Sequence, residues 1–265
     1  YAISLRIVGS EMCIRDSVYS VYENRLQNKI KNENLPQHIG LIHDGHRRYS
    51  RRENLLTYEV SYRIGMVRFK ECLAWCDELG INHVTSWLLS KENLSRPKEE
   101  LNSYYLVLNE LFQELLIDDL VDNFKINFVG STDLLPEYLQ NSIKQLQEIR
   151  GGGEKVLTIA LGYGGRQEIV DAIKSLLKEN KDLNIDDLIK SINDEQIRDH
   201  LYSPDSPDID LIIRTSGESR LSGFLLWQSA YSEVVFQDVY WPEFRKIDFL
   251  RCLREYVQRD RRFGK

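Results

Sequence analysis

Cysteine is scarce in this 265-residue chain, and neither cysteine nor histidine is spaced as in a metal site. The four cysteines include no Cys-x-x-Cys pair and are too few for a disulfide scaffold. The five histidines also lack the spacing of zinc ligands. We therefore expect reduced thiols, a cytoplasmic protein and no zinc site.

Long apolar runs and an excess of positive charge are missing as well. No stretch approaches the roughly 18 to 20 apolar residues that cross a bilayer. The net charge of -6 argues against nucleic acid as a partner, because binding the phosphate backbone requires a positive field. The chain also lacks a Gly-x-x-x-x-Gly-Lys-Ser/Thr phosphate loop. Any polyphosphate ligand must therefore be bound by a local basic cluster.

The first 35 residues differ in pattern from the rest. Residues 1–17 lack the basic start and long apolar run of a signal peptide, and we predict a non-native or disordered leader. Residues 18–35 predict an amphipathic helix with Val18, Val21, Tyr22 and Leu26 on one side. Packing on its own domain is favoured about twofold over peripheral contact with the inner face of a membrane, which stays open.

Residues 36–265 alternate short β-rich runs with longer helical patterns. The predicted strands are His38–His43, His83–Leu89, Lys125–Val129, Val156–Leu161, Asp210–Arg214 and Glu233–Val239. The predicted helices are Tyr62–Leu79, a run from Pro97 to Asn123, a run from Pro136, and Ile169–Leu177. This alternation predicts a single α/β domain with a six-stranded, mostly parallel sheet surrounded by helices.

Arginine-bearing turns follow three of these strands, as DGHRRYSRR from Asp44, SKENLSRP from Ser90 and RTSGESRLS from Arg214. Ligands gather at the carboxyl ends of parallel strands, and arginine donates in a fork that matches phosphate oxygens. A single basic turn is more often just solvated. Three of them at one edge predict a ligand with several phosphates.

Two acidic residues accompany these turns. A diphosphate is usually bound with Mg²⁺, which prefers carboxylate, water and phosphate oxygens. Asp44 follows the first strand and Glu233 begins the sixth. We therefore predict Mg²⁺ as a cofactor, with Asp44 and Glu233 as metal ligands.

Five collinear segments resemble the cis-prenyltransferase family, which includes undecaprenyl diphosphate synthase. They are HIGLIHDGHRRYSRR, LLSKENLSRPKEEL, INFVGSTDLLPEYL, LTIALGYGGRQEIVDAI and IDLIIRTSGESRLSGFLLWQSAYSEVVFQDVYWPEF, together with the terminal RDRRFGK. The RTSGE-RLS-FLLWQ-AYSE block is highly specific. The resemblance implies a sheet wrapped by helices around an apolar tunnel, and a homodimer.

The resemblance also implies an Mg²⁺-dependent reaction of isopentenyl diphosphate with an allylic diphosphate. The allylic diphosphate ionises, the double bond of isopentenyl diphosphate attacks the cation, and proton loss sets a Z double bond. Charge on the departing diphosphate is stabilised by the metal and the arginines. The implied catalytic residues are Asp44, His46, and the proton-handling pair Ser90 and Asn93.

The basic turns are divided between the two substrates by the same resemblance. The turn after the first strand surrounds the allylic diphosphate, and the turn after the fifth binds isopentenyl diphosphate, with Arg262-Phe263-Gly264 reaching it across the dimer. The implied substrate-binding residues are Gly45, Arg47, Arg48, Tyr49, Arg52, Leu88, Glu92, Arg96, Arg214, Arg220, Leu221 and Ser222.

Three positions depart from the family pattern. His46 stands where asparagine is usual, Tyr49 replaces a tryptophan, and Ser61-Tyr62 replace a Gly-His pair. His46 can hydrogen-bond or handle a proton near neutral pH, so we expect activity to change in detail only. A catalytically silent, diphosphate-lipid-binding partner subunit is the alternative.

Product length depends on Leu88, which stands where long-chain members have a small residue. Together with YENRL at residues 22–26, it favours the short-chain subgroup that makes Z-farnesyl diphosphate. A long-chain decaprenyl or undecaprenyl diphosphate synthase, with Leu88 as ordinary strand core, stays open. The sequence Asp118–Asp122 spells the DDxxD of trans-prenyltransferases and terpene synthases, but without a second acidic motif we interpret it as a solvated helix end.

Overall fold

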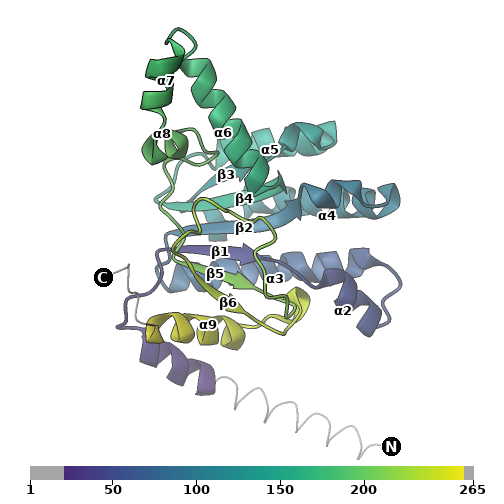
Figure 1. Cartoon of the computed structure of the whole chain (residues 1–265). Helices are drawn as coiled ribbons and strands as arrows, with labels where there is room; N and C mark the ends of the chain where they lie inside the picture. The colour runs from purple at the N-terminus through teal and green to yellow at the C-terminus, as the bar shows by residue number, and fades with distance from the viewer. Residues whose placement is uncertain (1–20, 260–265) are drawn as a thin grey trace, which may run out of the picture.

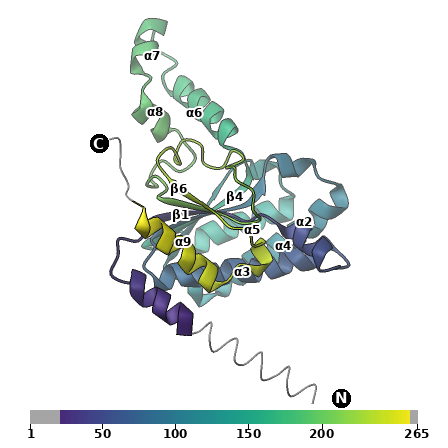
Figure 2. The same cartoon turned by 60° about the horizontal axis from the view of Figure 1, so that its bottom comes forward.

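The computed structural model describes residues 21–259, which form a six-stranded sheet with helices on both faces (Figures 1 and 2). The strand order is β3-β4-β2-β1-β5-β6, and every neighbouring pair is parallel. The α/β prediction is confirmed, and the sheet is wholly rather than mostly parallel. The strands are β1 His38–Ile42, β2 His83–Ser90, β3 Phe124–Val129, β4 Lys155–Tyr163, β5 Leu211–Arg214 and β6 Glu233–Phe236.

The central strands are apolar and covered on both sides. All residues of β1 and β5 are buried, as expected of a parallel sheet between two helical layers. The edge strand β6 ends three residues before the predicted Val239. There the carbonyl of Val239 accepts from the backbone N–H of Ser216 at 2.8 Å, so the chain pairs with the turn after β5 instead.

Helices α3, α4, α5 and α9 lie on one face of the sheet and α6, α7 and α8 on the other (Figure 2). The α-helices are α2 His46–Arg52, α3 Tyr58–Glu78, α4 Lys98–Ile117, α5 Glu137–Ile149, α6 Gly165–Glu179, α7 Ile185–Ser191, α8 Asp194–Asp199 and α9 Lys246–Gln258. Short 3₁₀ turns occur at Glu92–Ser95, Asp119–Val121, Thr132–Leu134 and Trp241–Glu243.

Helix α4 ends at Ile117, six residues before the predicted Asn123. The side chain of Asp118 accepts from the N–H of Leu120 at 3.1 Å and begins a separate 3₁₀ turn. The acidic DDxxD residues therefore lie in a turn before β3, in a sheet protein and not an all-helical bundle. The predicted long helix is wrong, and the rejection of the terpene-synthase alternative is confirmed.

The main core lies between the sheet and α3, α4 and α5. It includes Phe69, Leu73, Leu108 and Phe112, each completely buried. Each such side chain contributes about 1.5–3 kcal/mol on burial. Cysteines 72, 76 and 252 are free and buried, in agreement with the expected thiols.

The helix of residues 21–30 packs on the domain through a face that agrees only in part with the predicted one. Leu26 and Ile30 are buried, whereas Val21 is 69% exposed. The amide of Gln27 donates to Glu78 of α3 at 2.8 Å. Leu26 was predicted on the apolar face, whereas Ile30, four residues further along that face, was not. The predicted Val18, the leader of residues 1–17 and Arg262–Gly264 lie outside the described residues.

Among residues 21–259, no helix is long and apolar enough to span a bilayer. The implied apolar tunnel and the peripheral membrane contact stay predictions.

Candidate active site

The site begins where β1 and β5 end side by side, with Ile42 opposite Arg214 in the register. The Nη2 of Arg214 donates to Oδ2 of Asp44 at 2.7 Å. Thr215 fixes the same backbone, because its hydroxyl donates to the carbonyl of Asp44 at 2.7 Å and accepts from its N–H at 3.1 Å. The sheet therefore places the predicted carboxylate and arginine in direct contact.

Asp44 is ionised at neutral pH. Burial alone would raise its pKa, but the hydrogen bond and charge of Arg214, with help from Ser216 and Arg48, hold the pKa below its ordinary value. Its second oxygen lies 3.4 Å from Nη2 of Arg48. Asp44 thus offers a carboxylate that is already balanced by two guanidinium groups.

Arg214 also organises the turn that follows it. Its Nη1 donates to the hydroxyl of Ser222 at 2.8 Å and to the carbonyl of Arg220. Its Nε is buried and has no hydrogen-bond partner among the described residues. A buried donor left without a partner is costly, and Arg214 shares this feature with Arg47, Arg68 and Arg150 among the described residues.

Helix α2, which carries the arginines that follow β1, contacts the turn that follows β5. The Nη1 of Arg48 donates to Oε1 of Glu218 at 3.0 Å and its Nη2 to the hydroxyl of Ser216 at 2.7 Å. The helix starts after Gly45, whose φ of 110° favours glycine and whose added Cβ would lie 2.7 Å from the ring of Tyr240. Gly45 is therefore required by the backbone as well as by its predicted place beside a phosphate.

A cavity of about 330 Å³, here called the anion pocket, opens at this edge. Four arginines line it against a single aspartate, which gives it an excess of positive charge. Its lining is His43, Asp44, Gly45, His46, Arg47, Arg48, Arg51, Tyr62, Leu88, Asn93, Arg96 and Tyr104.

His46 is held as a neutral ring in the wall of this pocket. Its Nδ1 donates to the carbonyl of Ser61 at 3.2 Å, and the hydroxyl of Ser61 donates back to the carbonyl of His46 at 2.9 Å. Burial, aided by the charge of Arg96, lowers the pKa of His46 to about 4. This low pKa disfavours proton handling by His46 near neutral pH, whereas the expected hydrogen bond is present.

Tyr62 and Glu100 form a second cluster beside the pocket. The hydroxyl of Tyr62 donates to Oε1 of Glu100 at 2.8 Å. Nη1 of Arg96 lies 3.4 Å from the hydroxyl oxygen of Tyr62 and 3.4 Å from Oε1 of Glu100. Arg47 approaches Glu100 at 3.7 Å. Glu100 was not predicted, because nothing in the helical run KEEL distinguishes it from a solvated glutamate.

Ser90 and Asn93 lie together between two cavities. The hydroxyl of Ser90 accepts from the N–H of Asn93 at 3.2 Å. Asn93 faces the anion pocket, whereas Ser90 and Glu92 line a neighbouring cavity of about 670 Å³ together with Ser222. The predicted proton-handling pair thus stands beside both predicted substrate turns.

The remaining predicted residues line neither of these two cavities. Arg220 is exposed and pairs with Glu218. Arg52 pairs with Glu53 and Glu243, and its guanidinium lies 5.6 Å from the ring of Tyr49. Leu221 packs, partly buried, against the smaller apolar cluster behind β5.

Glu233 is not brought to Asp44 within one chain. It begins β6 opposite Leu211, whereas Arg214, beside Asp44, lies opposite Phe236 at the other end of the strand. Oε2 of Glu233 accepts from Arg259 at 2.6 Å. In residues 21–259, no three His, Cys, Asp or Glu side chains converge on a metal-sized site. A site with Asp44 as its one protein carboxylate is still compatible with Mg²⁺, because this ion is often held by one or two carboxylates plus substrate phosphates.

This geometry is that of an α/β protein with an arginine-lined pocket at the carboxyl edge of its sheet. The undecaprenyl diphosphate synthase model of the prenyltransferases matches residues 42–264, and the chain belongs to this family.

Curated relatives cover nearly the whole chain. Isoprenyl transferase 1 of Corynebacterium efficiens is 43% identical over 94% of this chain and 97% of its own length. The tritrans,polycis-undecaprenyl-diphosphate synthase (geranylgeranyl-diphosphate specific) of Methanopyrus kandleri is also 43% identical, over 94% and 92%.

Solved structures share the fold. Lavandulyl diphosphate synthase of Lavandula x intermedia, in complex with dimethylallyl diphosphate, superposes with a TM-score of 0.80 at 29% identity, covering 87% of this chain and 99% of that one. A probable undecaprenyl diphosphate synthase of Campylobacter jejuni gives 0.71 at 27% identity, covering 88% and 100%.

Proposed function

We propose that this chain is an Mg²⁺-dependent cis-prenyltransferase that joins isopentenyl diphosphate to an allylic diphosphate and releases a short Z-prenyl diphosphate. The observation that carries this proposal is the carboxylate of Asp44, paired with Arg214, in the wall of a pocket that is lined by four other arginines. Family membership and the names of the relatives support the prenyl-transfer chemistry.

The described residues suit a reaction in which a diphosphate leaves. When bound, Mg²⁺ at Asp44 would supply positive charge to the departing oxygens. Arg47, Arg48 and Arg96 already face the pocket, so little reorganisation is needed as negative charge develops. The partnerless Nε of Arg214 is the donor that we assign to a phosphate oxygen of isopentenyl diphosphate.

Proton removal is assigned to the Ser90 and Asn93 pair. This assignment is supported by their positions, since Asn93 lines the anion pocket, Ser90 lines the neighbouring cavity, and the backbone N–H of Asn93 donates to the Ser90 hydroxyl. His46 is assigned a positioning role, since its ring is neutral and already hydrogen-bonded to the backbone of α3.

The short product is supported by the apolar wall of the anion pocket. Leu88 lines the pocket, and the hydroxyl of Tyr104 donates to its carbonyl. Both residues are buried, and the main core lies behind them. A long-chain polyprenyl diphosphate synthase is the second candidate, favoured by the undecaprenyl diphosphate synthases among the relatives.

Glu233 is proposed as the second metal ligand, acting across a homodimer. Within one chain it lies at the opposite end of the strand from the Asp44 site. If Glu233 binds the same metal ion as Asp44, it must therefore do so from the other protomer of a homodimer. We further propose a cytoplasmic enzyme.

The test is to incubate the purified chain with Mg²⁺, radiolabelled isopentenyl diphosphate and geranyl or farnesyl diphosphate, and then to size the dephosphorylated products. A single C15 product from geranyl diphosphate, lost on chelation by EDTA, is expected. A ladder to C50 or C55 would instead identify the long-chain synthase. Binding of isopentenyl diphosphate without product from any primer would identify a silent subunit.

A further inference from the structure

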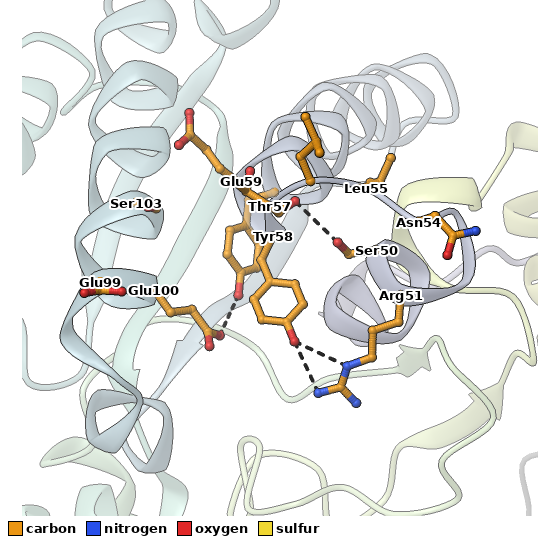
Figure 3. Close-up of a pocket in the computed structure, with 12 residues that line it drawn as sticks. Ser50, Arg51, Asn54, Leu55, Thr57, Tyr58, Glu59, Glu99, Glu100 and Ser103 are labelled. Carbon is orange, nitrogen blue, oxygen red and sulfur yellow. Dashed lines mark hydrogen bonds between the residues drawn. The ribbon is translucent and has the colours of Figure 1, made fainter.

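Two large cavities beside the anion pocket differ in the charge of their linings. One, of about 710 Å³, lies between the end of α2 and the first turns of α3 and α4, and is lined by three glutamates and one arginine (Figure 3). This excess of negative charge disfavours a diphosphate. The other is the neighbouring cavity of about 670 Å³, which is lined by two cations, Lys91 and Arg166, against Glu92. By charge, only the neighbouring cavity suits a second diphosphate.

Lys91 faces this neighbouring cavity beside the residues assigned to isopentenyl diphosphate. Ser90 and Ser222 line the same cavity, and the hydroxyl of Ser222 accepts from Nη1 of Arg214 at 2.8 Å. The start of α6 passes close on the other side, because a Cβ added to Gly164 would lie 3.7 Å from Cβ of Lys91. The ammonium of Lys91 therefore belongs to the cavity in which Ser222 would meet a phosphate.

The side chain of Lys91 is held by a chain of three hydrogen bonds. Its Nζ donates to Oε1 of Gln167 at 2.7 Å, and Nε2 of Gln167 donates to Oδ1 of Asp171 at 2.8 Å. The hydroxyl of Tyr202 donates to the other oxygen of Asp171 at 2.6 Å. Because an ammonium only donates and a carboxylate only accepts, the amide of Gln167 can make both of its bonds in one orientation only.

Asp171 is ionised, which strengthens this arrangement. Burial alone would raise the pKa of Asp171, but the hydrogen bonds of Tyr202 and Gln167 and the charges of Lys174 and Lys91 hold the pKa below its ordinary value. The carboxylate thus polarises the amide whose oxygen accepts from Lys91. The position of the ammonium is set from α6 and not by the loop after β2 alone.

The ammonium of Lys91 retains donors for a ligand. It has three N–H groups, and Gln167 accepts from one of them. Its Nζ has no other hydrogen-bond partner among residues 21–259. A lysine that is oriented before the ligand arrives loses less side-chain entropy on binding than a mobile one. Lys91 therefore offers a preoriented positive charge with two free donors.

We propose that Lys91 binds a diphosphate oxygen of isopentenyl diphosphate in the neighbouring cavity, and that Gln167 and Asp171 are positioning residues that orient its ammonium. This inference rests on the proposed function and deepens it, because it adds a substrate-binding lysine and its supporting side chains to the site. The family resemblance implies roles for Ser90 and Glu92, on either side of Lys91, but none for Lys91 itself. Lys91 does not line the anion pocket, so its effect is confined to one of the two substrates.

The experiment measures the Kd of isopentenyl diphosphate by calorimetry, with Mg²⁺ and without an allylic diphosphate, and the KM of each substrate during turnover. Lys91→Met retains the length of the side chain but removes its charge. We expect the Kd and KM of isopentenyl diphosphate to rise about tenfold, the value of one charge-assisted hydrogen bond, and the KM of the allylic diphosphate to stay unchanged. Unchanged values for isopentenyl diphosphate would overturn the proposal, as would an equal rise for both substrates.

Lys174→Met is the matched control. Lys174 lies on the same helix as Gln167, 3.8 Å from Oδ1 of Asp171, and is exposed, but it lines neither cavity assigned to a substrate. Its loss should change the Kd of isopentenyl diphosphate less than about twofold. A rise equal to that of Lys91→Met would show that any nearby positive charge has this effect, and would overturn the assignment to Lys91.

Gln167→Leu tests the positioning role. It retains Lys91 but removes the carbonyl that holds the ammonium, so the Kd should rise about threefold. In a Lys91→Met background the same substitution should have no further effect, because no ammonium is left to orient. A further rise of the same size in that background would mean that Gln167 acts through the structure of α6, and would overturn its positioning role.

The binding measurement separates this inference from the proposed function. If the unaltered chain gives no product from any primer, the proposed transfer reaction fails, and the Kd values of the variants still decide the role of Lys91. If the unaltered chain does not bind isopentenyl diphosphate at all, both are overturned.

Discussion

The two ends of the same sheet handle charge in opposite ways. At the amino end, His38 bonds through both ring nitrogens, to Pro207 at 2.7 Å and Thr85 at 2.8 Å, and Glu233 pairs with Arg259. At the carboxyl end, four arginines face a cavity that holds one aspartate, and Arg214 retains a buried donor without a partner. Charged groups are thus paired within the chain at the amino end, although Nδ1 of His83 is buried there without a partner, whereas the carboxyl end presents an excess of arginine to a cavity.

Backbone strain is found in the turn that follows β5, at the carboxyl end of the sheet. Ser216, Gly217 and Ser222 all have positive φ, and all lie in the turn that follows β5 at the carboxyl end. Such conformations are costly for serine and persist where the surroundings impose them. Arg48 and Arg214 supply those surroundings through their bonds to Ser216 and Ser222. Strain and unbalanced charge therefore coincide at one edge, which is where chemistry is expected.

The largest effect should come from Arg214. Arg214→Ala removes the partner of Asp44 and the donor assigned to substrate, so kcat/KM should fall on the order of 10²- to 10³-fold. The matched control is Lys155→Ala at the amino end, where Lys155 pairs with Asp77 and lines neither cavity assigned to substrate. Steady-state kinetics with both substrates should show less than about a threefold change for this control. Comparable losses in the two variants would remove the distinction between the ends.

A second prediction asks whether the amino end serves a neighbouring chain. Asp44→Asn and Glu233→Gln should each lower activity by at least about tenfold, as loss of a metal-site group commonly does. If Glu233 acts across a homodimer, mixing the two variants with subunit exchange creates one intact site in each mixed dimer. About a quarter of the original activity should then return, because half the dimers are mixed.

The readout is the rate of the mixture against the mean rate of the separate variants. Activity that stays at the mean after exchange, with mixed dimers demonstrated by mass, would show that Glu233 is not supplied in trans. A Glu233→Gln variant with full activity would show that Glu233, at the amino end of the sheet, takes no part in the reaction.

The fold was largely predictable because its strands are short apolar runs separated by clear turns. Strand limits shifted where tertiary pairing decided them, as at Val239, which bonds to Ser216 instead of extending β6. Helices α2, α7, α8 and α9 were not predicted, and the residues of α2 had been expected to form a turn. Ile185 and Ile189 of α7 are both more than 60% exposed, so this short helix buries little and leaves a weak periodic signal.

The site was predictable in its chemistry but not in its pairings. Asp44 follows β1 and Arg214 is the last residue of the neighbouring β5, so the topology alone brings them together. Glu100 and Glu218 were missed because a glutamate that pairs with arginines resembles a solvated one in sequence. The in-chain separation of Glu233 from Asp44 depends on where β6 begins, which the alternation of strands and helices does not place in space.

The third prediction concerns His46 and stability. Its pKa is about 4 in the folded chain against about 6.5 unfolded, so the unfolded chain takes up a proton first as the pH falls. The stabilisation is full above about pH 6.5 and is lost progressively down to about pH 4. Between pH 7 and pH 5 this single group should cost about 2 kcal/mol of unfolding free energy.

His46→Asn removes that term while retaining a polar side chain. Urea titrations measure how far the free energy of unfolding falls between pH 7 and pH 5. For the variant this fall should be smaller by about 2 kcal/mol than for the unaltered chain, whatever the absolute stability of the variant. His38, whose pKa burial also lowers to about 4, remains in both proteins and so does not affect the difference. An unchanged drop would mean that His46 is not neutral by burial.

The smallest effect should come from Arg48. It is more exposed than Arg214, and three other arginines line the anion pocket and can also bind the phosphates. Arg48→Ala should raise the KM of the allylic diphosphate about tenfold, the value of one charge-assisted hydrogen bond, with little change in kcat. Glu218→Gln is the matched control, because it breaks the Arg48–Glu218 pair but leaves the guanidinium in place. If Glu218→Gln raised KM as much as Arg48→Ala, the role of Arg48 would be to hold the turn after β5, and the carboxyl end would be closer in character to the self-paired amino end.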